Sequence, residues 1–337
     1  MASSDPRRIL VIQLRRIGDC VLCAPALRAL KARFPRARLD FLVEAGPAGL
    51  LEGIAGPDRV LVYNRQAPLA EILKVRRERY DLVIDFLGNP RSALLTALSG
   101  APRRRGLALR GRAWAYTVAV PPAEIGSCYV AEFKVRLLGR IGVPPPPDLE
   151  LAVTVRPDAQ HDMDLWLRAQ HLDGVRPLVG VSPTSRRSAR MWRPDAFAAA
   201  ADRLVRAGGA ALIFAGPGEA PAAEAVARRM TGRHVIAACE GLPQLAALIG
   251  RCGVLLTNDN GPMHLAVALN VPTVTVYGPT RRENWHPGRP PHAAFQADIP
   301  CAGCGLQTVP QCPYEHKCMT LVGADEVAAA AERALAR

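Results

Sequence analysis

Residues 257–280 (TNDNGPMHLAVALNVPTVTVYGPT) hold side chains whose types and spacing suit a phosphorylated ligand. A polar turn there joins an apolar, strand-like run to a helical one, so we expect a helix to begin at the end of a buried strand. The N–H groups and dipole of such a terminus favour anions. An ordinary strand–helix connection with Asp259 as N-cap explains the turn equally well. The candidate ligand contacts are Asp259, Asn260, Gly261 and His264.

Two earlier loops carry side chains that suit a nucleotide sugar. Residues 182–194 (SPTSRRSARMWRP) follow a strand-like run and combine hydroxyls with arginines, which bind phosphate oxygens by charge-assisted hydrogen bonds. The candidates in this loop are Thr184, Ser185 and Arg190. Residues 216–219 (GPGE) follow the next strand, and Glu219 there can accept hydrogen bonds from ribose hydroxyls. The alternatives are a solvated basic loop and an acid that merely begins its helix.

Asp19 is the candidate for acid–base chemistry. It follows the first strand-like run, residues 8–14 (RILVIQL), where a carboxylate can act as general base toward an incoming hydroxyl. From this residue alone, an N-cap for the following helix is the commoner role. The loop lacks G-x-G-x-x-G and the chain lacks G-x-x-x-x-G-K-[ST], so neither a dinucleotide fingerprint nor a P-loop is present.

Four cysteines form a second specific pattern, Cys301-x2-Cys304-x7-Cys312-x5-Cys318, in a Gly/Pro-rich stretch. Four thiols at such spacing predict a structural site for Zn or Fe, although the pairs lie closer together than in common zinc modules. A set of packed free thiols is the alternative.

The formal net charge of +13 implies an anionic partner. Aromatic residues are only 5% of the chain, and nucleic-acid modules usually interleave bases with stacking aromatics, so we expect no nucleic-acid partner. The basic cluster Arg103, Arg104 and Arg105 is a candidate contact to an acceptor or a membrane surface, and a solvated face is its alternative. No signal peptide is visible, and no apolar run approaches the ~18 residues of a spanning helix. We therefore expect a cytoplasmic protein.

The elements that position these residues alternate between strand and helix. Strand-like runs at residues 8–14, 38–43, 59–63 and 82–85 alternate with helical segments, which indicates a parallel sheet covered by helices. The run GVPPPPD (142–148) is stiff and extended, and the same rhythm restarts after it. The sequence thus predicts two doubly wound, Rossmann-like domains separated by a cleft. They span residues 1–147 and 148–337, the second with the Cys-rich loop 301–318 and a C-terminal helix.

These motifs, in this order, resemble glycosyltransferase family 9, the ADP-heptose:lipopolysaccharide heptosyltransferases. The resemblance rests on Gly-Asp after the first strand, the Ser/Thr- and Arg-bearing loop ending in Trp-x-Pro, Gly-Pro-x-Glu, and Asp-x-Gly-Pro-x-His-Leu-Ala with Tyr-Gly-Pro-Thr. It covers essentially the whole chain, and residues 259–280 are its most specific part. It implies the GT-B architecture, in which the second domain holds the nucleotide-sugar donor.

The resemblance also implies a role for each matching residue. Asp19 takes the place of the catalytic base, and Arg190 stands where the family usually has a Lys on the donor diphosphate. The remaining matches are Thr184 and Ser185 in the small polar loop, Glu219 at the donor ribose, Asp259 at the donor sugar, and Gly261 and His264 at the diphosphate-facing helix start. One departure is the turn Pro183-Thr184-Ser185, where Pro-Gly-Ala is common.

The implied reaction is inverting transfer of a heptose, or a related sugar, from an ADP-sugar to a lipopolysaccharide inner-core or other glycan acceptor. No cofactor is required for catalysis, because Arg190 and the helix start at Gly261 would stabilise the leaving diphosphate. The expected partners are ADP-heptose, an anionic glycolipid and, peripherally, the cytoplasmic face of the inner membrane. The alternatives are a family member with another donor and acceptor, and a Cys-rich metal- and nucleic-acid-binding protein.

Overall fold

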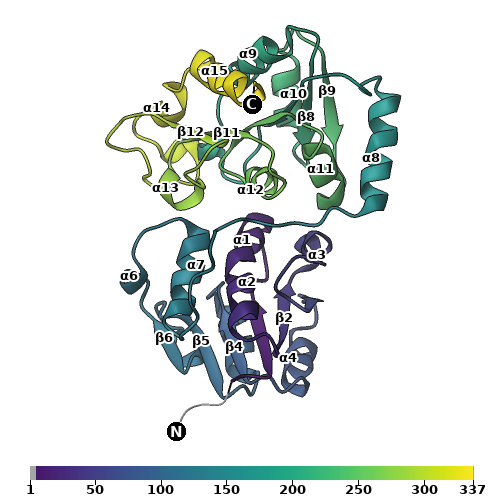
Figure 1. The fold of residues 1–337 in the computed structure, drawn as a ribbon. Coiled ribbons are helices and arrows are strands. Elements are labelled where there is room, and N and C mark those ends of the chain that lie inside the picture. Colours follow the sequence, from purple (N-terminus) through teal and green to yellow (C-terminus); the bar gives the residue numbers. More distant parts are fainter. Residues whose placement is uncertain (1–4, 337) are drawn as a thin grey trace. The chain divides into compact units, whose positions relative to one another are not determined.

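The computed structural model describes residues 5–336, which form two α/β units divided between Thr154 and Val155 (Figure 1). The boundary predicted after residue 147 falls a few residues earlier, because the segment beyond it still packs on the first unit. There Arg28 Nη1 donates to the carbonyl of Glu150 at 2.7 Å, and the Thr154 N–H donates to the carbonyl of Leu50 at 2.8 Å.

The first unit is built on a six-stranded parallel sheet in the order β3-β2-β1-β4-β5-β6. Its strands are β1 (Arg8–Ile12), β2 (Arg38–Val43), β3 (Arg59–Val62), β4 (Leu82–Asp85), β5 (Arg103–Leu107) and β6 (Val118–Val120). The order reverses between β1 and β4, so the carboxyl end of β1 lies where open α/β sheets bind ligands.

Helices cover the faces of this sheet. They are α1 (Ile17–Val21), α2 (Ala24–Arg33), α3 (Ala45–Leu51), α4 (Pro68–Arg77), α5 (Pro90–Leu98), α6 (Pro122–Ile125) and α7 (Val130–Gly139). α2 packs against α7, and α4 packs against α5. The sequence predicts one kinked helix from residue 18 to about 34, but the structure has α1 and α2, because Pro25 cannot continue a preceding turn.

The second unit repeats this topology in the order β12-β11-β10-β7-β8-β9, again with parallel pairs. Its strands are β7 (Leu178–Ser182), β8 (Ala210–Ala215), β9 (His234–Ala238), β10 (Val254–Asn258), β11 (Thr273–Tyr277) and β12 (Ala293–Gln296). β12 escapes the sequence analysis, because AAFQ is a short, half-buried edge strand with little β-propensity. The chain order is that of a Rossmann fold in both units.

The helices of the second unit form two layers on its sheet. They are α8 (Pro157–Ala169), α9 (Pro194–Val205), α10 (Ala220–Ala227), α11 (Leu242–Ile249), α12 (Gly261–Ala268), α13 (Arg282–Trp285), α14 (Lys317–Thr320) and α15 (Ala324–Leu335). α9 packs against α10 and α15, and α11 packs against α8 and α12. Between residues 5 and 336, no helix has both the length and the apolar character needed to cross a membrane.

Candidate functional site

The loops predicted to bind a donor leave the second sheet at one edge. β7 and β10 are neighbours, and the strand order reverses between them. Because β7, β8 and β10 run parallel, their carboxyl ends lie together, and so do the loops that follow them. The structure therefore brings together the polar residues after β7, after β8 and after β10.

Thr184 and Glu219 are hydrogen bonded across the first two of these loops. Thr184 Oγ1 donates to Glu219 Oε2 at 2.9 Å, and the same oxygen accepts the Gly216 N–H at 3.0 Å. Thr184 is buried and Glu219 is half-buried. The two bonds hold the carboxylate in one orientation, which a contact to a ribose diol requires. Ser185 is half-buried beside them, and its Oγ accepts from the Arg187 N–H at 3.5 Å.

We expect Thr184→Val to weaken ADP binding about tenfold, because it keeps the shape but removes the hydroxyl that orients Glu219. Isothermal titration calorimetry measures the affinity. Thr231→Val is the matched control, since Thr231 Oγ1 donates to Asp202 at 2.9 Å outside these loops. An unchanged ADP affinity in the Thr184 variant would exclude this role.

The asparagines of the third loop fix the loops to one another. Asn260 Oδ1 accepts the Met263 N–H at 3.1 Å, so Asn260 is the N-cap of α12. The sequence analysis offered Asp259 for that role, and this alternative is wrong. Asn260 Nδ2 donates to Ser182 Oγ at 2.9 Å and to the carbonyl of Thr184 at 3.0 Å. The first contact is made to the last residue of β7 and the second to the loop that follows it. Asn260 is therefore a scaffold residue as well as a candidate donor contact.

Asn258 and Trp192 were not predicted as site residues. Asn258 Oδ1 accepts the Trp192 N–H at 2.8 Å, and its Nδ2 donates to the carbonyl of Pro183 at 2.7 Å. Asn258 is fully buried and Trp192 is 2% exposed. These bonds clamp both ends of the arginine-bearing loop to β10. A polar residue at the last position of a buried strand is the sequence signal for Asn258.

Arg190 and Asp259 form the charged centre of the second unit. Arg190 Nη1 lies 2.6 Å from Asp259 Oδ2, and the side chains are 18% and 4% exposed. Burial and the positive charges of Arg190 and Arg186 lower the pKa of Arg187, while Asp259 opposes this. The guanidinium groups of Arg190 and Arg187 thus both interact with the Asp259 carboxylate, and Arg186 adds a further positive charge near Arg187. A bound diphosphate would balance the excess positive charge.

The first turn of α12 offers a ligand fewer free backbone N–H groups than the sequence suggests. Pro262 has no N–H, and the Met263 N–H is bonded to Asn260. Of the first three helical residues, only Gly261 can therefore present an N–H to a ligand. For a diphosphate to bind here, the arginines would have to supply most of its stabilisation.

His264 is buried within α12 and is 3% exposed. Its ring centroid lies 6.0 Å from that of Trp285. Burial, together with the nearby His286, lowers the pKa of His264 to about 3. The ring is therefore neutral at physiological pH, so it cannot contribute charge to a diphosphate site.

The buried neutral His264 predicts a loss of stability in acid. Between its unfolded pKa of about 6.5 and its folded pKa of about 3, the unfolded state binds the proton and the folded state does not. Stability therefore falls as pH falls through this window, by up to about 1.4 kcal/mol per pH unit. We expect His264→Gln to flatten this slope, as measured by urea unfolding at pH 7 and pH 5. An equal slope in the variant would contradict the assignment.

Asp19 lies in α1, directly beyond the carboxyl end of β1. The N-cap of α1, Arg16, has φ 68° and ψ 118°, which a non-glycine residue adopts only under strain. Cys23 Sγ donates to the carbonyl of Asp19 at 3.3 Å, and Cys20 Sγ donates to that of Gln13 at 3.2 Å. Two buried thiols therefore fix the backbone around the candidate base by hydrogen bonds to its carbonyl groups.

A buried lysine beneath this turn was not predicted. Lys134 is 4% exposed, and its Nζ donates to Gln13 Oε1 at 2.8 Å and lies 5.0 Å from the ring centroid of Phe86. Burial raises the pKa of the Cys23 thiol to about 11, although Lys134 opposes the shift. α7 therefore supplies a positive charge beside the helix of Asp19. One lysine within an amphipathic helix gives no sequence signal for such a position.

The arginines Arg103, Arg104 and Arg105 do not form a single patch. They are consecutive residues of β5, so Arg104 points to the opposite face from the other two. Arg104 also donates to the backbone carbonyls of Ala115 and Ala101, at 2.9 Å and 2.7 Å. Burial and the charge of Arg103 lower the pKa of Arg105. A membrane or acceptor contact can therefore involve Arg103 and Arg105, but not all three.

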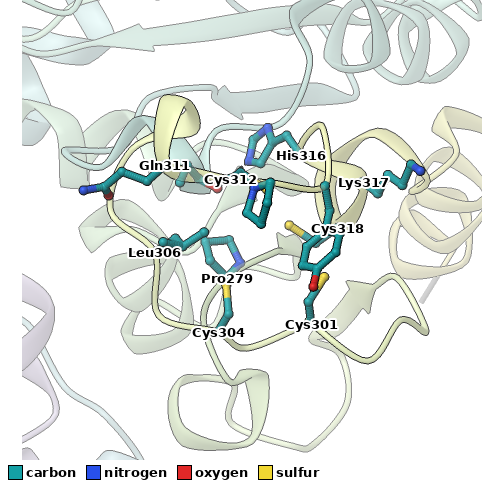
Figure 2. A pocket seen from close by; sticks show the side chains of 12 residues that line it. Pro279, Cys301, Cys304, Leu306, Gln311, Cys312, His316, Lys317 and Cys318 are labelled. Atoms are coloured by element: carbon teal, nitrogen blue, oxygen red, sulfur yellow. Dashed lines mark hydrogen bonds between the residues drawn. The ribbon is translucent and has the colours of Figure 1, made fainter.

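The four cysteines of the predicted metal site line one cavity of about 260 Å³ (Figure 2). All are free thiols; Cys318 is buried, Cys304 is exposed, and the other two are half-buried. Burial first, and then the other three cysteines, raise the pKa of Cys318 to about 11. Over residues 5–336, no three such side chains already stand in the arrangement of a metal site. The four cysteines thus line the same cavity, but they are not arranged as the ligands of a metal ion.

Two Rossmann-type units in one chain, each with a parallel sheet and its functional loops after the strands, define the GT-B class of glycosyltransferases. The model of glycosyltransferase family 9 (heptosyltransferase) matches residues 70–315. The protein belongs to this family and is a glycosyltransferase. The resemblance seen in the sequence is confirmed.

Known proteins are similar to this chain in sequence or in structure over nearly its full length. Lipopolysaccharide heptosyltransferase 3 of Escherichia coli (strain K12) is 25% identical over 348 residues, which cover 96% of this chain and 96% of the relative. The family 9 glycosyltransferase of Veillonella parvula DSM 2008 superimposes with a TM-score of 0.85 at 23% identity, covering 98% and 97% of the two chains. The E. coli ADP-heptose LPS heptosyltransferase II gives a TM-score of 0.80 at 22% identity and 98% coverage of both chains.

Proposed function

We propose that this glycosyltransferase moves a heptose from ADP-heptose to the inner core of lipopolysaccharide, with inversion at the anomeric carbon. The observation that carries the proposal is the Arg190–Asp259 pair, set among further arginines at the strand edge. Relatives named as lipopolysaccharide heptosyltransferases support the sugar and the acceptor. The ADP-heptose named for an E. coli relative supports the donor.

The donor would lie across the loops of the second unit. Arg190 would bind the diphosphate, with the Gly261 N–H as a further donor. Glu219, oriented by Thr184, would accept hydrogen bonds from the ribose hydroxyls. Asp259 would then exchange part of its contact with Arg190 for hydroxyls of the transferred sugar.

Transfer would begin with the acceptor hydroxyl. Asp19 takes its proton as the oxygen attacks the anomeric carbon from the side opposite the diphosphate. The new C–O bond forms while the bond from the anomeric carbon to the phosphate oxygen breaks, and ADP leaves with the electron pair. Arg190 stabilises the charge that develops on ADP, the role that a divalent cation has in other transferases. Product release frees the proton from Asp19.

The first unit would bind the acceptor. A phosphorylated glycolipid suits the basic character of the chain, and Arg103 and Arg105 are candidate contacts on one face of β5. Attachment to the inner membrane would then be peripheral and salt-dependent, on its cytoplasmic side.

A donor screen tests the proposal. ADP-heptose should raise the melting temperature and release ADP when a deacylated inner-core acceptor is added, because a ligand stabilises the state that it binds. UDP-, GDP- and dTDP-sugars serve as comparisons. Turnover of one of these instead of ADP-heptose would favour the alternative of a family member with another donor. Family membership already makes the chain an enzyme, so a purely metal-binding module is no longer a candidate.

A further inference from the structure

Gln13 joins the end of β1 to the turn that carries Asp19. It is 2% exposed, and its N–H donates to the carbonyl of Leu42 in β2 at 3.1 Å. Its backbone carbonyl accepts the thiol of Cys20 at 3.2 Å, and its Nε2 donates to the carbonyl of Arg15 at 3.4 Å. Gln13 is therefore bonded to the sheet, to the turn after β1 and to α1.

Lys134 fixes the side chain of Gln13 from α7, the helix that packs against α2 (Figure 1). Its Nζ donates to Gln13 Oε1 at 2.8 Å and lies 5.0 Å from the ring centroid of Phe86, the residue that follows β4. The strand order reverses between β1 and β4, so the ammonium group lies at the point where open α/β sheets bind ligands. Both of these partners are uncharged, although Lys134 is only 4% exposed.

The charge of this lysine acts on the helix of Asp19. A buried ammonium group is costly unless anionic charge lies within reach. Burial raises the pKa of the Cys20 thiol well above its usual range and that of Cys23 to about 11, so both thiols are neutral at physiological pH. At both thiols the charge of Lys134 opposes the shift and the charge of Asp19 adds to it. The ammonium group and the Asp19 carboxylate therefore lie within electrostatic range of the same two side chains.

The other charged groups around α1 belong to neighbouring segments of the first unit. Glu44 stands directly before α3, which packs on α1. Its Oε1 lies 3.7 Å from Arg91 Nη1, so a guanidinium group of α5 balances its charge. Arg15 and Arg16, in the turn before α1, are exposed. Of these cations only Lys134 is buried, where solvent and salt screen its charge least.

We propose that Lys134 is a positioning residue of the transfer reaction: it fixes the turn of Asp19 through Gln13, and its charge stabilises the Asp19 carboxylate. Asp19 must be ionised to accept a proton, so a buried cation near it keeps the base in its active form to a lower pH. The effect on catalysis rests on the proposed function, in which Asp19 is the base. The effect on the ionisation of Asp19 is independent of that function.

The first test is a carbon-13 NMR titration of the aspartate carboxyl groups in the full chain, with Asp19→Asn to assign the signal of Asp19. Lys134→Met should move the midpoint of the Asp19 titration upward by about one pH unit, because the carboxylate loses an opposite charge. Lys134→Gln, which keeps a donor toward Gln13, should do the same and serves if the Met variant does not fold. Lys31→Met is the matched control, since Lys31 pairs with Asp58 at 2.7 Å, and should leave the midpoint unchanged. An unmoved midpoint in the Lys134 variants overturns the proposal.

The second test measures sugar transfer as a function of pH. Lys134→Met should lower kcat at pH 7 by about 10- to 10²-fold, the effect of a misplaced base, and should move the acid limb of the pH profile upward as far as the NMR midpoint. The Kd for ADP should stay unchanged, because the donor loops belong to the second unit. A lower kcat with an unmoved acid limb would make Lys134 purely structural and overturns the proposal. If the wild type transfers no sugar from any nucleotide donor, the proposed function fails, and the NMR titration alone decides whether Lys134 stabilises the Asp19 carboxylate.

Discussion

Asp19→Asn should lower kcat by about 10²- to 10⁴-fold while leaving the Kd for ADP unchanged, because the amide keeps the shape of the side chain but cannot accept the acceptor's proton. The fold should survive this change. The contact from Cys23 that holds the turn is made to the backbone carbonyl of Asp19, not to its carboxylate. The measurement is ADP release in the presence of donor and acceptor, with ADP binding followed by calorimetry.

The matched control for this variant is Glu52→Gln, which neutralises an exposed carboxylate of the first unit. It should leave kcat unchanged. Transfer at the wild-type rate by the Asp19 variant would remove Asp19 as the base without affecting family membership. A parallel loss of ADP affinity would instead indicate that the variant disturbs donor binding.

The donor loops could be predicted from the sequence for a topological reason. In a parallel sheet, every strand ends at the same edge, so polar residues that follow apolar runs must meet there. Thr184, Glu219, Arg190 and Asp259 were found in this way, and the structure joins them in two pairs. The resemblance to a known family then gave each of them a proposed role.

The features that could not be predicted from the sequence depend on the exact residue at which a helix begins and on the rotation of a helix about its axis. The N-cap of α12 is Asn260 and not Asp259, because both residue types cap helices and only the backbone decides between neighbours. The buried position of Lys134 depends on how α7 is rotated about its axis, and a short amphipathic pattern does not determine this rotation. The split of Arg103–Arg105 across β5 was foreseeable, since consecutive residues of any strand alternate between its faces.

Arg190→Met should weaken ADP binding by about 10²- to 10³-fold, because the bound diphosphate loses a hydrogen-bonded partner of opposite charge. It should also destabilise the fold by about 3 kcal/mol, because Asp259, only 4% exposed, loses this guanidinium. Arg190→Lys should recover most of the affinity, since the family usually has a Lys at this position, but it loses the bidentate geometry.

The double variant Arg190→Met/Asp259→Asn separates the two effects. Neutralising Asp259 removes the buried charge that Arg190 balances, so urea unfolding should show much of the lost stability restored. ADP affinity should stay low, because the positive charge that faces the diphosphate is still missing. If the double variant instead recovered both stability and ADP affinity, Arg190 would serve only to neutralise Asp259. The diphosphate would then have to be bound by Arg187 and the Gly261 N–H, a weaker site that salt would disrupt more readily.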